Sequence, residues 1–121
     1  MADSNNHLIR KIVISTGVVT TVAGTGSRGS ANGTGTSASF NQPSGITTDG
    51  TNLYVADSMN NLIRKIVIST GAVSTVGGTG SSGSANGTGT SASFNYPRGI
   101  TTDGTNLYLS LIHISEPTRP Y

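Results

Sequence analysis

Short apolar segments alternate with clusters of Gly, Asp and Asn along the chain, a pattern typical of β-strands joined by tight turns. Between residues 45 and 78 the pattern predicts four strands, near 46–49, 52–56, 62–68 and 72–76. Asp49-Gly50 separates the first two and is a strong hairpin signal. Four short strands on short turns predict one antiparallel meander.

The third of these strands is apolar on both faces, with Leu62 and Ile66 on one side and Ile63 and Val67 on the other. A sheet with one solvated face would alternate more cleanly, so this sheet requires a neighbour on each side. One such unit cannot bury its own surface and needs stacked copies. Radially stacked four-stranded sheets are the blades of a β-propeller.

A tandem repeat supplies those copies. Residues 2–54 and 56–108 differ at only 8 of 53 aligned positions. Residues 8–14 and 18–22 should therefore repeat the last two strands in a neighbouring blade. We expect the following divisions: the outer half of a blade (1–23), a Gly/Ser/Thr-rich connector (24–44), a complete four-stranded blade (45–78), a second connector (79–98), the inner half of the next blade (99–108) and a tail (109–121). Each connector should have a loose middle and an end pinned by an aromatic residue.

A series of motifs runs through the complete unit: Phe40-Asn41-x-Pro43-x-Gly45-Ile46, Asp49-Gly50, Leu53-Tyr54-Val55-Ala56-Asp57, Asn60-Asn61-x-Ile63-Arg64-Lys65-Ile66 and Gly71-x-Val73-x-Thr75-Val76. Together they closely resemble the NHL repeat, and the resemblance covers nearly all of residues 2–108. It implies an all-β fold, an incomplete NHL-type β-propeller with one full blade and two half blades. It also implies a parent of about six blades, of a kind often found in secreted or cell-surface bacterial proteins.

Composition and charge exclude several function classes. The chain has no cysteine, so it has neither a disulfide nor a thiolate metal site. The formal charge of +2 is too small to indicate an acidic partner. Six basic residues in the first 108, without interleaved aromatics, argue against nucleic-acid binding. No apolar run is long enough for a membrane-spanning segment.

Residues 24–29 and 78–83 both match the G-x-G-x-x-G pattern of dinucleotide-binding loops. That site requires the N-terminus of a following helix, and only more Gly, Ser, Thr and Asn follow here. We interpret both as connector loops and expect no cofactor.

Asp3 and Asp57 end the second strand of their units, where they could reach a propeller channel as metal or substrate ligands. We favour bonding to backbone N–H groups of their own turns. No nucleophile–base pair is present, so we expect no catalytic, cofactor-binding or metal-binding residue. The residues that we assign to structural turns or anchors are Asp3, Asp57, Asp49, Asp103, Phe40, Phe94, Pro43 and Pro97.

Two further sets of residues are interpreted as structural rather than as functional. His7 is replaced by Asn61 in the other copy, so it is expected on a surface turn rather than as a repeated ligand. Arg10 and Lys11, like Arg64 and Lys65, point to opposite faces of the sheet, and all four are expected to donate hydrogen bonds between blades, with buried stems.

The leading functional hypothesis is a non-catalytic binding or scaffold segment of a larger bacterial NHL-repeat propeller protein, with neighbouring blades as its first partners and an unknown protein or glycan ligand. The near identity of the two copies favours a structural or avidity role over a tailored pocket. The alternative is a fragment of a propeller enzyme, a lyase or lactonase-like hydrolase, whose active-site residues lie outside this segment. Because bare blade faces cannot close a ring, we expect the chain to aggregate or assemble, for instance as three copies completing a six-bladed wheel.

The repeat ends abruptly between Tyr108 and Leu109. Residues 109–119, LSLIHISEPTR, resemble the in-frame translation of a transposase adapter used in sequencing libraries, matching at all eleven residues. We therefore expect this tail not to be native coding sequence and assign no function to it. At the other end Met1 aligns with Val55, and because GTG encodes valine internally but also starts bacterial genes, we expect a reading frame opened inside a longer array.

Overall fold

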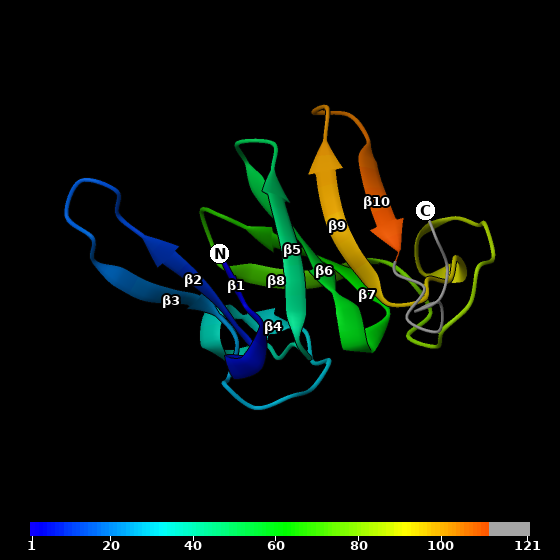
Figure 1. The fold of residues 1–121 in the computed structure, drawn as a ribbon, viewed down its shortest axis with the longest axis horizontal. Coiled ribbons are helices and arrows are strands. Elements are labelled where there is room, and N and C mark those ends of the chain that lie inside the picture. Colours follow the sequence, from blue (N-terminus) through cyan, green and yellow to red (C-terminus); the bar gives the residue numbers. More distant parts are fainter. Residues whose placement is uncertain (112–121) are drawn as a thin grey trace, which may run out of the picture.

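The computed structural model describes residues 1–111 and shows an all-β chain of antiparallel sheets (Figure 1). The strands are β1 (Ala2–Asp3), β2 (Leu8–Ile12), β3 (Val19–Ala23), β4 (Gly33–Thr34), β5 (Pro43–Thr48), β6 (Asn52–Asp57), β7 (Leu62–Val67), β8 (Ala72–Gly77), β9 (Pro97–Thr102) and β10 (Leu107–Leu111). Four 3₁₀ turns accompany them: η1 (Ser4–Asn6), η2 (Gly35–Ser37), η3 (Ser58–Asn60) and η4 (Gly89–Ser91).

The complete blade is the sheet β5-β6-β7-β8, in which each strand pairs antiparallel with the next. Its register places Ile46 opposite Val55, Val55 opposite Arg64, and Arg64 opposite Thr75. These four residues therefore share one face of the blade, because cross-strand partners project to the same side. The four strands and the meander predicted from the sequence are confirmed.

Partial blades lie on both sides of this sheet. β1, β2 and β3 form the preceding blade, and β9 and β10 form the inner half of the following one. The inner strands β5 and β9 run close together, as Figure 1 shows. Gly45 is required there, because a Cβ at this position would overlap the carbonyl oxygen of Arg98.

The first connector is more ordered than the sequence predicts. Its middle contains β4, which adds to the outer edge of β8 by pairing Gly33 with Val73 and Thr34 with Ala72. The blade thus becomes a five-stranded sheet. The expectation of a loose middle is wrong because backbone groups, which need no apolar side chain, hold this segment to the strand edge.

The core lies between the first two blades and is closed by the first connector. Its buried residues are Ile9, Ala23, Ala38, Phe40, Val55, Ile66 and Val73. Ile63, on the opposite face of β7, is 2% exposed. Burial on both faces explains why this strand carries apolar residues on both of its sides.

In the described part of the chain, no helix is long and apolar enough to cross a membrane. β10 extends past the end of the repeat, with Leu109 paired to Ile100. The rest of the proposed adapter-derived tail, including His113 and Glu116, lies outside the described residues.

Candidate functional site

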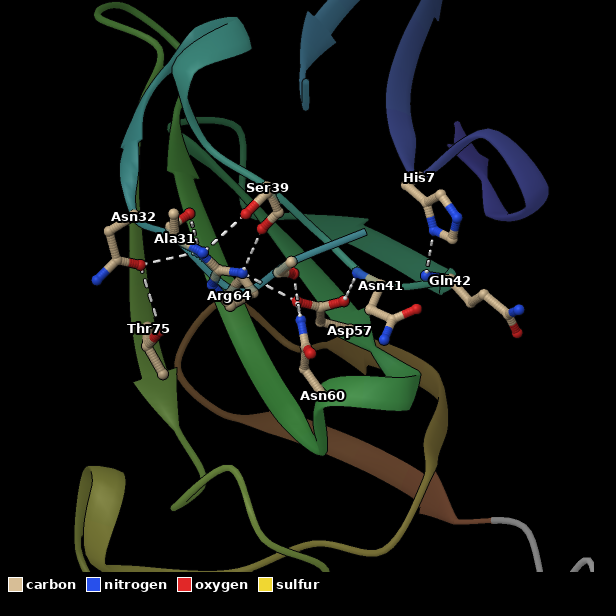
Figure 2. Close-up of polar contacts among 11 residues, drawn as sticks. His7, Ala31, Asn32, Ser39, Asn41, Gln42, Asp57, Asn60, Arg64 and Thr75 are labelled. Atoms are coloured by element: carbon tan, nitrogen blue, oxygen red, sulfur yellow. Dashed lines mark hydrogen bonds and ion pairs between the residues drawn. The ribbon is translucent and has the colours of Figure 1, made fainter. Parts of the chain in front are cut away.

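Asp57 ends β6 and carries the most enclosed carboxylate of the described chain. The η3 turn follows it, and Asn61 closes the turn with a left-handed backbone, φ 56°. Asp57 Oδ1 accepts a hydrogen bond from the backbone N–H of Asn41 at 2.8 Å. Oδ2 accepts from Asn60 Nδ2 at 2.8 Å and from Arg64 Nη1 at 2.9 Å (Figure 2). Both oxygens are therefore occupied by protein donors.

Arg64 joins the blade to the first connector. Its guanidinium donates to the carbonyl oxygens of Ser39 and Ala31 and to Asn32 Oδ1, each at 2.9 Å. Its charged carbon lies 5.0 Å from the centre of the Phe40 ring, within range of a cation–π interaction. The side chain is fully buried. In the described part of the chain its acceptors lie in the connector and in its own blade, not in a neighbouring blade as the sequence predicted.

The pKa of Asp57 is raised above its ordinary value, because the effect of burial outweighs the hydrogen bonds from Asn41 and Asn60 and the positive charge of Arg64, which lower it. Enclosing an ion pair is costly unless every polar group finds a partner. Here hydrogen bonds from and to neighbouring protein groups satisfy nearly every polar atom of the Asp57–Arg64 ion pair, and of these atoms only Arg64 Nε lacks an acceptor. This geometry suits a rigid clamp between the blade and the connector.

Asp3 begins the same arrangement in the preceding blade. It accepts hydrogen bonds from Asn6 at 3.1 Å and from Arg10 at 3.2 Å. The side chains of Asp3 and Arg10 are each 29% exposed. Both aspartates differ from expectation in one respect, since neither bonds a backbone N–H of its own turn; Asp57 takes its backbone donor from the connector.

Asp49 and Asp103 occupy the hairpin turns at the opposite end of the blades. Oδ1 of Asp49 accepts from the backbone N–H groups of Thr51 and Asn52, at 2.9 and 2.8 Å. Asp103 repeats this geometry, and Tyr108 adds a phenol hydrogen bond at 3.1 Å. Backbone hydrogen bonds lower the pKa of Asp49 and lower that of Asp103 to about 2.

The aromatic and proline residues assigned as anchors lie at the blade interfaces. Phe40 is completely buried, whereas Phe94 packs close to Gly77 of β8. Pro43 and Pro97 begin the inner strands, and their carbonyl oxygens accept hydrogen bonds from Ser4 and Ser58. The first serine of η1 and that of η3 thus fix the start of the next inner strand.

The expected surface position of His7 is wrong. The residue is 9% exposed, and its Nδ1 accepts a hydrogen bond from the backbone N–H of Gln42 at 3.0 Å. Asn61 plays the same part in the other copy, accepting from Tyr96 at 2.8 Å. Exchange of His for Asn at one repeat position is the sequence signal for this shared acceptor, because Nδ1 and Oδ1 can occupy similar positions.

One end of the blades collects η1, η3 and the starts of β5 and β9, at the bottom of Figure 1. We call this surface, formed by residues 4–7, 41–44, 58–61 and 95–98, the turn face. Four of the eight differences between the copies fall on it, at positions 5/59, 7/61, 42/96 and 44/98. Exposed side chains here include Asn5, Met59 and Arg98. Among the described residues, no group of three His, Cys, Asp or Glu side chains is placed to hold a metal ion.

Known proteins are similar to this chain in sequence and in architecture. NHL repeat-containing protein 2 from Gallus gallus is 36% identical over 78 residues, which are 64% of this chain and 11% of that protein. The resemblance to NHL-repeat proteins is confirmed. No protein-family model matches the chain. The chain spans 7–11% of the length of the curated relatives that it matches.

Solved structures match over most of the chain. A protein of unknown function from Bacteroides thetaiotaomicron superposes with a TM-score of 0.84 at 32% identity, covering 92% of this chain and 29% of the other. An auxiliary nutrient binding protein from the same organism has a TM-score of 0.64 at 26% identity, over 83% and 28% of the two chains. The fold is therefore that of NHL-type propeller blades, one complete and two partial.

Proposed function

We propose that this chain is a non-catalytic binding or scaffold segment of a larger bacterial NHL-repeat propeller protein, and that it binds through the turn face. The distribution of differences between its two copies carries this proposal. The clamp residues Asp57, Asn60 and Arg64 have identical counterparts in the first copy. The turn face instead varies, although the backbone N–H groups of Gln42 and Tyr96 keep equivalent side-chain acceptors.

The chemistry of the varying residues suits recognition. The second copy presents Met59, Tyr96 and Arg98 where the first has Asn5, Gln42 and Ser44. An aromatic ring, a flexible thioether and a guanidinium give apolar contact and directional hydrogen bonding over a small area. The side chains of Asp57, Asn60 and Arg64, by contrast, form their hydrogen bonds within the protein and are not available to a substrate.

Similarity to an auxiliary nutrient binding protein supports binding rather than catalysis, and the Bacteroides origin of both solved neighbours supports a bacterial source. We place the parent protein outside the cell or at its surface, where the NHL-type resemblance also points. A protein or a glycan is the expected ligand, since both offer the polar and apolar groups that the turn face can contact.

The test exchanges residues between copies. A variant with Met59→Asn, Tyr96→Gln and Arg98→Ser gives the second copy side chains that the first already accommodates. The matched control, Ala72→Val with Ser74→Thr, exchanges outer-strand differences. Fluorescently labelled chain is applied to arrays of polysaccharides and peptides, and we expect the wild type and the control to be retained on a common subset that the turn-face variant loses. Equal retention of all three proteins, or no retention of the wild type, would contradict the proposal, and turnover of a retained compound would contradict a non-catalytic role.

A further inference from the structure

The first blade exposes a sheet face that the complete blade buries. Ile12 is 46% exposed and Val19 is 43% exposed, whereas their counterparts Ile66 and Val73 are 0% and 4% exposed. The side chain of Arg10 is 29% exposed, and that of Arg64 is 0% exposed. We call this surface of the β1-β2-β3 sheet the open face. An apolar patch with a partly buried charge indicates a docking surface.

The complete blade shows what covers this kind of surface. Residues 29–41 of the first connector lie across it, and Arg64 donates to three of their oxygen atoms. Asn60 Nδ2 donates to the carbonyl oxygen of Gly29 at 2.7 Å, and Asp57 accepts from Asn41 at 2.8 Å. Each blade residue in these contacts has an identical counterpart on the open face, at Asp3, Asn6 and Arg10.

A second copy of the covering segment exists within the same chain. Residues 83–95 of the second connector are identical to residues 29–41 at every position. Within the described part of the chain, no arginine donates to the oxygen atoms of Ala85, Asn86 or Ser93. The open face and residues 83–95 are thus the two halves of an interface that the chain already forms once.

Both halves are already shaped for association. In the second connector Ala85 N–H donates to Ser93 Oγ at 2.8 Å, the distance found for Ala31 and Ser39 in the docked connector. On the open face, Asp3 already accepts from Asn6 and Arg10. Preorganisation lowers the entropic cost of binding.

We propose that, when this 121-residue chain is separate from the larger propeller of the proposed function, its open face binds residues 83–95 of a second copy, head to tail. Arg10 of one copy would donate to Ala85, Asn86 and Ser93 of the next, and Phe94 would lie over its guanidinium. The edges agree with this arrangement, since Met1 and β1 pair with Leu8, Ile9 and Arg10 of β2 and leave Lys11 and Ile12 on that edge for β10 of the neighbour.

A head-to-tail contact of this kind is heterologous, so it generates a closed ring or an open filament. Propellers have about four to eight blades. Because each chain supplies two repeats, closure of the ring corresponds to assemblies of about two to four copies.

The experiment is sedimentation velocity of the full 121-residue chain over a concentration series. We expect reversible association of the wild type. Arg10→Ala and Asn86→Lys should each weaken it at least tenfold, because the first removes the donor and the second places a positive charge beside it. Ser81→Lys adds the same charge to an exposed loop position whose counterpart, Ser27, is also exposed and forms side-chain-mediated hydrogen bonds with Thr25 of its own loop, so it should associate like the wild type.

Mixing separates head-to-tail docking from other contacts. Arg10→Ala keeps an intact connector and Asn86→Lys keeps an intact open face, so an equimolar mixture should form heterodimers that neither variant forms alone. A synthetic peptide of residues 83–95 should dissociate the wild-type assembly. A wild type that stays monomeric throughout, association that is indifferent to both variants, or a mixture that behaves as two separate monomers would overturn the proposal.

Discussion

Removal of the Arg64 side chain should be among the most damaging single changes to this fold. Arg64→Ala deletes four hydrogen bonds and leaves the Asp57 carboxylate buried without its cation. Breaking one partner out of a buried pair costs about 3–5 kcal/mol. A domain of ordinary stability has only about 5–15 kcal/mol in total, so the expected loss is a large part of it.

The repeat supplies a matched control for this prediction. Arg10→Ala removes the same residue from the same strand position, but there the ion pair is partly exposed and lacks the covering connector. Exposed pairs contribute about 0–1 kcal/mol, so the two variants should differ by about 3 kcal/mol.

Urea unfolding followed by circular dichroism measures this difference at pH 7. The protein concentration must be low enough to keep the chain monomeric, because association would bury Arg10 as well. If Arg64→Ala does not fold, Arg64→Lys retains the charge without the planar fork and should show an intermediate loss. Equal losses for the variants at positions 10 and 64 would refute the view that the connector makes this pair strong.

Four further predictions follow from the same structure. Thermal unfolding should show that Gly77→Ala changes the free energy of unfolding by less than about 1 kcal/mol, since the first copy carries the buried Ala23 at this position. Gly45→Ala should lower it by about 1–3 kcal/mol, because the added Cβ overpacks against the next inner strand. In urea unfolding, His7→Asn should preserve the acceptor for the following connector and His7→Ala should lose about 1–3 kcal/mol. Because the pKa of Asp103 is lowered to about 2, its ionised form stabilises the turn above about pH 4, and this contribution should disappear as the pH falls towards 2; Asp103→Asn should flatten the dependence of the urea midpoint on pH in that window. When the locus is amplified from source DNA and sequenced, the codons after Tyr108 should encode a further repeat that begins with valine or a similar residue and then Ala-Asp-Ser. Adapter-like codons for residues 109–119 in native DNA would contradict the adapter hypothesis.

The strands could be predicted because their signals are local. Alternation of apolar residues, Asp-Gly turns and a second copy of the same pattern all agree over residues 45–78. The doubly apolar strand β7 further indicated a neighbour on each face, and Ile63 and Ile66 are both buried. Consistency between local pattern and global packing makes such sequences readable.

The connector and the clamp could be predicted only in part. Arg64 was recognisable as a hydrogen-bond donor with a buried stem, but not its partners, because two of its acceptors are backbone carbonyl oxygens of the connector, which every residue carries. β4 consists of Gly33 and Thr34. Glycine is depleted in strands, and one threonine in a stretch of Gly, Ser, Thr and Asn gives no alternating pattern that would indicate a strand. His7 appeared to be an expendable surface residue because its replacement by Asn was interpreted as a loss of function rather than as retention of an acceptor.

The residues that pack a blade against its connector are identical in the two copies, whereas several exposed residues of the turn face differ. The first connector docks on the second blade through groups that are identical to those of the second connector and the first blade, so the interface itself does not distinguish one blade from another. The order of blades is then set by the covalent chain within a molecule, and between molecules by which open face meets which connector. Substitutions on the exposed turn face leave this interface unchanged and should cost little stability. A repeat built in this way can vary its binding surface blade by blade while its packing stays fixed, and the differences at positions 59, 96 and 98 follow that rule.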